Sequence, residues 1–92
     1  MGHKKTVQFN LGGISKLPND KPVVYKILTD NDNNNYTGIA KKGRVQERIT
    51  EHVGEIPGLK VQIEQFRSIG AAGEKEKNII SRSEPKYNKK GK

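Results

Sequence analysis

An almost unbroken apolar run at residues 22–29 constrains the fold more than any other feature of this sequence. The run contains Val23, Val24, Tyr25, Ile27 and Leu28. β-Branched and aromatic residues in so continuous a run are typical of a central strand. Only 30% of the 92 residues are apolar, so the core is small and we expect this strand to lie at its centre.

Shorter patterns place the other elements around this strand. Residues 30–35 are all Asp or Asn, which favour turns and predict a hairpin. Leu59, Val61 and Ile63 alternate with polar residues, as in a half-buried strand. The order of the patterns predicts an α+β domain with a small mixed sheet covered by helices. The expected elements are strands at 36–40 and 59–64 and helices at 44–53 and 71–83.

The first twenty residues are predicted to form an N-terminal extension that packs on this core. Val7, Phe9 and Leu11 alternate with polar residues, which indicates a short strand at 7–11. The domain itself is expected to span residues 21–88. Residues 89–92 are expected to form a basic, mobile tail.

The charge balance favours a polyanion as the partner. The chain has 18 Lys and Arg against 10 Asp and Glu, a net charge of +8, which is typical of nucleic-acid-binding domains. The alternative is a protein whose surface is merely rich in lysine. No apolar run is long enough to cross a membrane, and no signal-peptide pattern is visible, so we expect a cytoplasmic protein without a membrane partner. The absence of Cys excludes disulfides and thiolate chemistry.

One carboxylate stands in an unexpected place. On a helix at 71–83, Glu76 shares the apolar face with Ala72 and Ile80, at a spacing of four residues. A buried carboxylate is costly without a partner, so the position predicts a cation, a metal or a set of donors nearby. The alternative is that Glu76 lies at the edge of the face and reaches solvent.

Basic and aromatic side chains offer the groups needed to bind or hydrolyse a phosphate. Arg44 and Arg48 are neighbours on one ridge of the predicted helix and could hold a phosphate, or could form an ordinary solvated face. Tyr25 and Tyr36 lie on adjacent predicted strands, where they could activate a water or simply pack together. His52 could act as a base, although its apolar neighbours also fit a structural role.

Four blocks of the sequence, in order, resemble the GIY-YIG nuclease family. Val23-Val24-Tyr25 and Tyr36-Thr37-Gly38 are similar to the family's two signature tripeptides. Residues 43–52 look like its first helix, and residues 76–80 and 85–88 look like its closing "E-x-x-L-I … K-P-x-Y-N" motif. The match covers residues 21–88, which is most of the chain.

The resemblance implies a central three-stranded sheet, mixed or antiparallel, flanked by helices, and the metal-dependent hydrolysis of DNA phosphodiester bonds. It makes Glu76 the ligand of Mg²⁺ or Mn²⁺, Arg48 the residue that neutralises the scissile phosphate, and Tyr36 the residue that activates water, with Tyr25 hydrogen-bonded nearby. Arg48 and the metal would also lower the pKa of the phenol. The remaining matched positions are assigned to phosphate or DNA binding: Lys41, Lys42, Arg44, His52 and Asn88.

The sequence departs from the family at two positions. Val23 stands where the first tripeptide begins with Gly, and Ile39 stands where many members carry Lys. No added DNA-binding domain is present, so a protein partner could supply specificity, and the substrate could also be RNA or branched DNA. Two alternatives stay open: a nucleic-acid-binding module of the same fold that does not cleave, and an RNA-associated basic protein whose likeness to the family is accidental.

Overall fold

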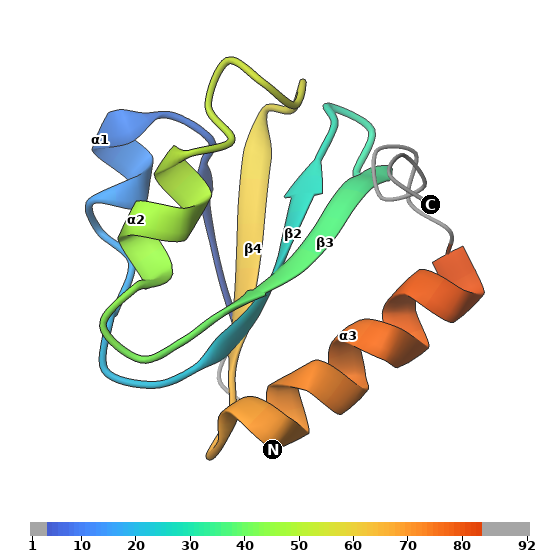
Figure 1. Ribbon diagram of the computed structural model, residues 1–92. Helices are drawn as coiled ribbons and strands as arrows, with labels where there is room; N and C mark the ends of the chain where they lie inside the picture. Colours follow the sequence, from blue (N-terminus) through green and yellow to red (C-terminus); the bar gives the residue numbers. More distant parts are fainter. Residues whose placement is uncertain (1–3, 84–92) are drawn as a thin grey trace.

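The computed structural model describes residues 4–83, which form an antiparallel four-stranded sheet with helices on both faces (Figure 1). The strands occur in the order β1-β4-β2-β3. The predicted α+β class is confirmed, with β2 at an interior position of the sheet. The strand bounds are Lys4–Gln8 for β1, Val23–Leu28 for β2, Asn34–Ala40 for β3 and Lys60–Gln65 for β4.

The expectation of three strands is wrong, and of the two expected sheet types, mixed or antiparallel, the antiparallel one is confirmed. Strand β1 pairs with β4 along its whole length, so that Val7 lies opposite Val61, and every strand pair is antiparallel. The strand predicted at 7–11 lies at residues 4–8 instead. The chain leaves the sheet there because Asn10 caps helix α1 (Leu11–Ile14) by accepting a hydrogen bond from the backbone N–H of Gly13.

The two faces of β2 carry two separate apolar clusters. Val23, Tyr25 and Ile27 belong to the larger cluster, which is covered by α1 and by helix α2 (Val45–Thr50). Val24 belongs to the smaller cluster, which is covered by helix α3 (Ile69–Ser83). Figure 1 shows α1 and α2 on one side of the sheet and α3 on the other. The alternation of side chains along β2 therefore supplies both layers of the core.

The helices begin and end a few residues from their predicted bounds. The helix predicted at 44–53 ends at Thr50, and Gly54 in the following turns has a φ of +85°, which glycine tolerates better than other residues. The helix predicted at 71–83 begins at Ile69, because the Ser68 hydroxyl accepts a hydrogen bond from the N–H of Ala71. The positions predicted at 84–92, Asn88 and the basic tail among them, lie outside the described residues.

Truncating the centre of the larger cluster should weaken the fold markedly. Ile27 is fully buried, so Ile27→Ala should lower the free energy of unfolding by about 2–5 kcal/mol. Leu59, which precedes β4 and is 57% exposed, is the control, and Leu59→Ala should change it by less than about 0.5 kcal/mol. Urea denaturation followed by circular dichroism measures both. Equal losses in the two variants would contradict this description of the core.

Candidate functional site

Three rings gather beside β3, an edge strand of the described sheet. Tyr25 comes from β2, Tyr36 from β3, and His52 from the turn that follows α2. The ring centroids of Tyr36 and His52 are 4.7 Å apart, and those of Tyr25 and Tyr36 are 6.0 Å apart. The predicted hairpin is present and brings the two tyrosines together, and the end of α2 adds the imidazole.

The absence of a side chain at Gly38 allows this cluster to form. Gly38 lies directly opposite Tyr25 in the β2–β3 pairing. A Cβ atom at position 38 would lie 2.7 Å from the Tyr25 hydroxyl and 2.9 Å from a ring carbon of Tyr36. The Tyr25 phenol therefore passes over the backbone of β3 where a larger residue would exclude it.

The Tyr25 hydroxyl is hydrogen-bonded to His52, at 2.8 Å from Nε2. The other ring nitrogen, Nδ1, is buried and has no hydrogen-bond partner among residues 4–83, and the nearest carboxylate oxygen, on Glu55, is 3.6 Å away. If Tyr25 donates to Nε2, the proton of the neutral imidazole is on Nδ1 and faces Glu55. His52, which the resemblance assigns to phosphate binding, is hydrogen-bonded to the Tyr25 phenol in the structure.

Burial governs the protonation of both tyrosines. It raises the pKa of Tyr25 well above the ordinary value of a phenol, and the neighbouring Tyr36 raises it further. Burial and the Glu76 carboxylate also raise the pKa of Tyr36, whereas the Arg48 guanidinium acts in the opposite direction. As expected, Arg48 by itself lowers the pKa of the Tyr36 phenol. The net pKa shift is upward, because desolvation is the larger effect.

These electrostatic effects also locate Arg48 and Glu76. Arg48 on α2 and Glu76 on α3 both influence the pKa values of Tyr25 and Tyr36, and the two helices lie on opposite faces of the sheet. Arg48 is exposed, and its guanidinium has no ion pair with any residue in the described range 4–83. The structure therefore places Tyr25 beside Tyr36, and Arg48 and Glu76 are within electrostatic range of both phenols.

Glu76 is the metal ligand expected from the resemblance, and its surroundings suit a hard cation. Burial raises the pKa of its carboxyl group, and no Lys, Arg or His of the described chain forms an ion pair with it. No group of three or more His, Asp or Glu side chains able to hold a metal occurs among residues 4–83. Mg²⁺ keeps several waters and requires only one or two carboxylates, so a single Glu fits this ion and does not fit zinc.

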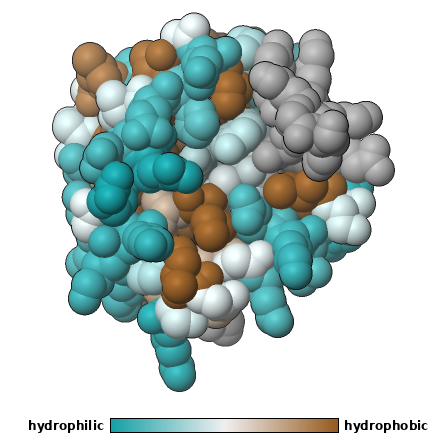
Figure 2. All heavy atoms as spheres, viewed as in Figure 1, coloured by the Kyte–Doolittle hydropathy of each residue, from teal (hydrophilic) through white to brown (hydrophobic). Residues whose placement is uncertain are grey.

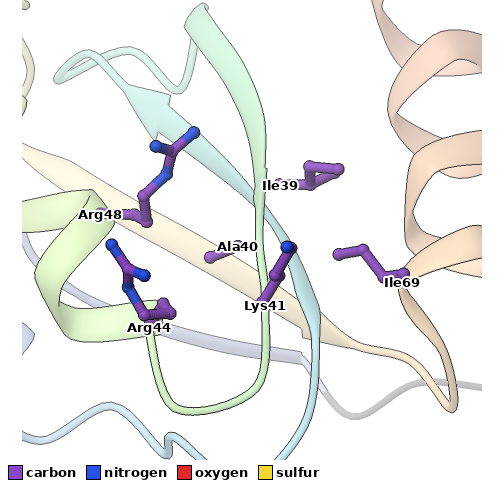
Figure 3. A pocket seen from close by; sticks show the side chains of 6 residues that line it. All are labelled: Ile39, Ala40, Lys41, Arg44, Arg48 and Ile69. Atoms are coloured by element: carbon purple, nitrogen blue, oxygen red, sulfur yellow. The ribbon is translucent and has the colours of Figure 1, made fainter.

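A hollow of about 250 Å³ adjoins this site, between β3 and the starts of α2 and α3 (Figure 3). Two of the expected phosphate-binding residues, Lys41 and Arg44, line it together with Arg48. Lys42 is exposed and is not among its described lining residues. Arg44 is already engaged, since its Nε lies 2.9 Å from Oε1 of Glu47.

Sequence reasoning missed three features of this region. The motif comparison used Gly38 only as part of a tripeptide and did not predict the close approach of Tyr25. A glycine inside a strand is a general signal that another group comes close to the backbone. Glu55 and Ile69, which lie beside His52 and in the hollow, had no signal at all, because their roles depend on how separate elements pack.

Comparisons of the chain with protein-family models, with curated proteins and with solved structures found no match. The likeness to the GIY-YIG family therefore depends on the motifs quoted above. No helix within residues 4–83 is both long enough and apolar enough to span a membrane.

Filling the space at position 38 should displace the Tyr25 phenol. Gly38→Ala is expected to lower the free energy of unfolding by about 1–3 kcal/mol through overpacking and to change the ring-proton shifts of His52 in NMR spectra. Gly73→Ala is the control, because no atom lies within 4 Å of the added carbon in α3, and it should stabilise the helix by about 0.5–1 kcal/mol. An unchanged His52 signal in Gly38→Ala would refute the close approach.

Glu76→Gln should stabilise the metal-free protein above the acidic range. Because burial raises the folded-state pKa, the folded protein holds this proton more tightly than the unfolded chain, and stability falls as the pH rises between the two pKa values. The variant lacks this loss, so its advantage over the wild type should vanish below the pKa of the unfolded carboxyl. Urea titrations from about pH 3 to about pH 8 measure the difference.

The exposed neighbour Glu74 on the same helix provides the control, and Glu74→Gln should show no such pH-dependent gain. Addition of Mg²⁺ should raise the stability of the wild type and leave that of Glu76→Gln unchanged. A pH-independent difference between Glu76→Gln and the wild type would contradict the assignment.

Proposed function

We propose that this protein is a divalent-metal-dependent endonuclease that hydrolyses phosphodiester bonds in DNA. The observation that carries the proposal is the cluster of Tyr25, Tyr36 and His52, whose phenols lie near enough to Arg48 and Glu76 for both charges to influence their pKa values. The resemblance gives catalytic roles to the two tyrosines, Arg48 and Glu76. The net charge of +8 suits the polyanionic substrate.

Charge stabilisation is the first requirement of this reaction. Hydrolysis of a phosphodiester builds negative charge on the non-bridging and leaving oxygens. Arg48, which has no ion pair among the described residues, offers a guanidinium fork to the non-bridging oxygens. Glu76 would hold Mg²⁺ or Mn²⁺, which supplies Lewis-acid stabilisation of the same oxygens when bound.

Removal of the water proton is the second requirement, and the raised phenol pKa values restrict how it happens. A free phenolate at Tyr36 is disfavoured, because burial raises its pKa. Instead, the Tyr36 oxygen takes the proton from water as its own proton moves to the Tyr25 oxygen and the Tyr25 proton moves to Nε2 of His52. The 2.8 Å contact between Tyr25 and His52 supports the last transfer, and Glu55 stands near the imidazolium that it forms.

A nucleic-acid-binding module of the same fold is the second candidate. The raised pKa of Tyr36 favours it, since a phenol that resists ionisation is a poor base unless the proton transfers are coupled. Such a module would use Arg48, Arg44 and Lys41 for phosphate contacts alone. Its affinity would weaken steadily with salt and would not depend on Glu76.

A nicking assay tests the proposal. Supercoiled plasmid incubated with the protein should be converted to the open-circular form in Mg²⁺ and not in EDTA. Glu76→Gln, Arg48→Ala and Tyr36→Phe should each reduce the rate by about 10²–10³-fold, the usual effect of removing one group that stabilises the transition state. The matched controls on α3, Glu74→Gln and Arg82→Ala, should nick at nearly the wild-type rate.

Two outcomes would overturn the nuclease assignment. Equal nicking by wild type and Glu76→Gln would mean that the activity comes from a contaminant. Undiminished DNA binding without any Mg²⁺-dependent nicking would establish the binding module instead.

A further inference from the structure

The hollow beside Arg48 has walls of opposite character. Figure 3 shows Arg44, which precedes α2, and Arg48, which lies within α2, on one side, with Lys41 between, and Ile39 and Ile69 opposite them. Ile39 lies on β3 and Ile69 is the first residue of α3. On this face of the molecule, hydrophobic surface shows between hydrophilic side chains (Figure 2). The hollow therefore presents an apolar wall and a cationic wall to the same occupant.

The cationic wall carries positive charge that no described carboxylate neutralises. Of its three cations, Arg44 alone is paired within residues 4–83, in a two-point contact with Glu47. Arg48 and Lys41 form no ion pair with any described residue. An occupant that complements both walls carries an anionic group and a surface without hydrogen-bonding groups that can pack on two isoleucines, as the face of a nucleobase can.

We propose that this hollow receives one unpaired nucleotide of the substrate strand, with its base against Ile39 and Ile69 and its phosphate at Arg48 and Lys41. In a paired duplex the base faces are stacked and only base edges, sugars and phosphates are accessible, so an aliphatic wall has nothing to contact. An unstacked base exposes its face to such a wall. The proposal rests on the nuclease function above and adds to it a preference for substrates with an unpaired nucleotide next to the cut.

The size and position of the hollow support this occupant. A volume of about 250 Å³ is slightly below that of small-ligand sites, which begin at about 300 Å³, so the hollow admits one small group and excludes a helix or a duplex end. Arg48 belongs both to the hollow and to the phenol cluster, so a nucleotide here is continuous with the phosphate that Arg48 holds.

Binding measurements in EDTA test the proposal without cleavage. The probes are a fully paired duplex, the same duplex with one unpaired adenine nucleotide, and that duplex with an abasic residue at the unpaired position. Fluorescence anisotropy should give the unpaired adenine a dissociation constant on the order of tenfold lower than either of the other two. The abasic probe retains the phosphate and the flexibility, so it isolates the contact with the base.

The variant Ile69→Ala should abolish this preference and leave the affinity for paired duplex unchanged. Val53→Ala is the control, since Val53 and Ile69 are both 38% exposed and Val53 lies outside the hollow. The proposal fails if the abasic probe binds as tightly as the adenine probe, or if Ile69→Ala retains the preference.

Free adenosine monophosphate is the last probe, because it carries the same base and the same phosphate group as the unpaired adenine nucleotide. If it binds more tightly than the duplex with the unpaired adenine, and Ile69→Ala weakens it, the hollow is a site for free nucleotides and the assignment to the strand is overturned. Failure of the nuclease function is seen separately, as loss of Mg²⁺-dependent nicking while the preference in EDTA remains.

Discussion

The site depends on one close approach, in which the phenol of Tyr25 passes over the backbone of β3 at Gly38. Tyr25 is 1% exposed, and a hydroxyl buried so deeply is costly unless it is hydrogen-bonded. The contact with His52 satisfies it and ties β2 to the turn after α2. Because Gly38 has no side chain, the ring of Tyr25 can extend from the core across the edge strand β3, and this determines where the three rings meet.

The charges around this cluster are not arranged for stability. Arg48 and Glu76 both act on the phenols, yet they form no ion pair with each other, and burial is the cause of the raised pKa of Glu76. A direct pair would offset part of the cost of placing a carboxylate in a half-buried position. Its absence within the described structure leaves a guanidinium and a carboxylate free to act on a third, charged group. The half-buried carboxylate of Glu76 therefore carries a desolvation cost that no described ion pair offsets, and the proposed binding of a metal would offset it.

The sequence correctly predicted the strands whose apolar residues mark their buried faces. It misplaced the strand whose residues are mostly polar and exposed. Strands β2 and β4 follow directly from apolar runs and alternation. Strand β1 was misplaced because Lys4, Lys5 and Thr6 are exposed, so the edge strand reads as polar, while the apolar residues after it belong partly to a capped helix. Likewise, the positions of Tyr36 and Arg48 could be anticipated from motifs, but the upward pKa shift could not, because desolvation depends on packing that no motif records.

The role of Ile39, which departs from the family's motif, can be inferred only from its position in the fold. In the sequence it is a missing cation, which weakens any account of phosphate binding. In the fold it lies across a hollow from Arg48 and beside Ile69, a residue thirty positions away that the start of α3 brings to the same wall. Cations alone bind paired and unpaired strands through the same phosphates and distinguish them poorly. An apolar wall next to the cations would change that balance, because it can contact only a base that is unstacked, and under the proposed function an isoleucine at position 39 favours unpaired strands where a lysine would not.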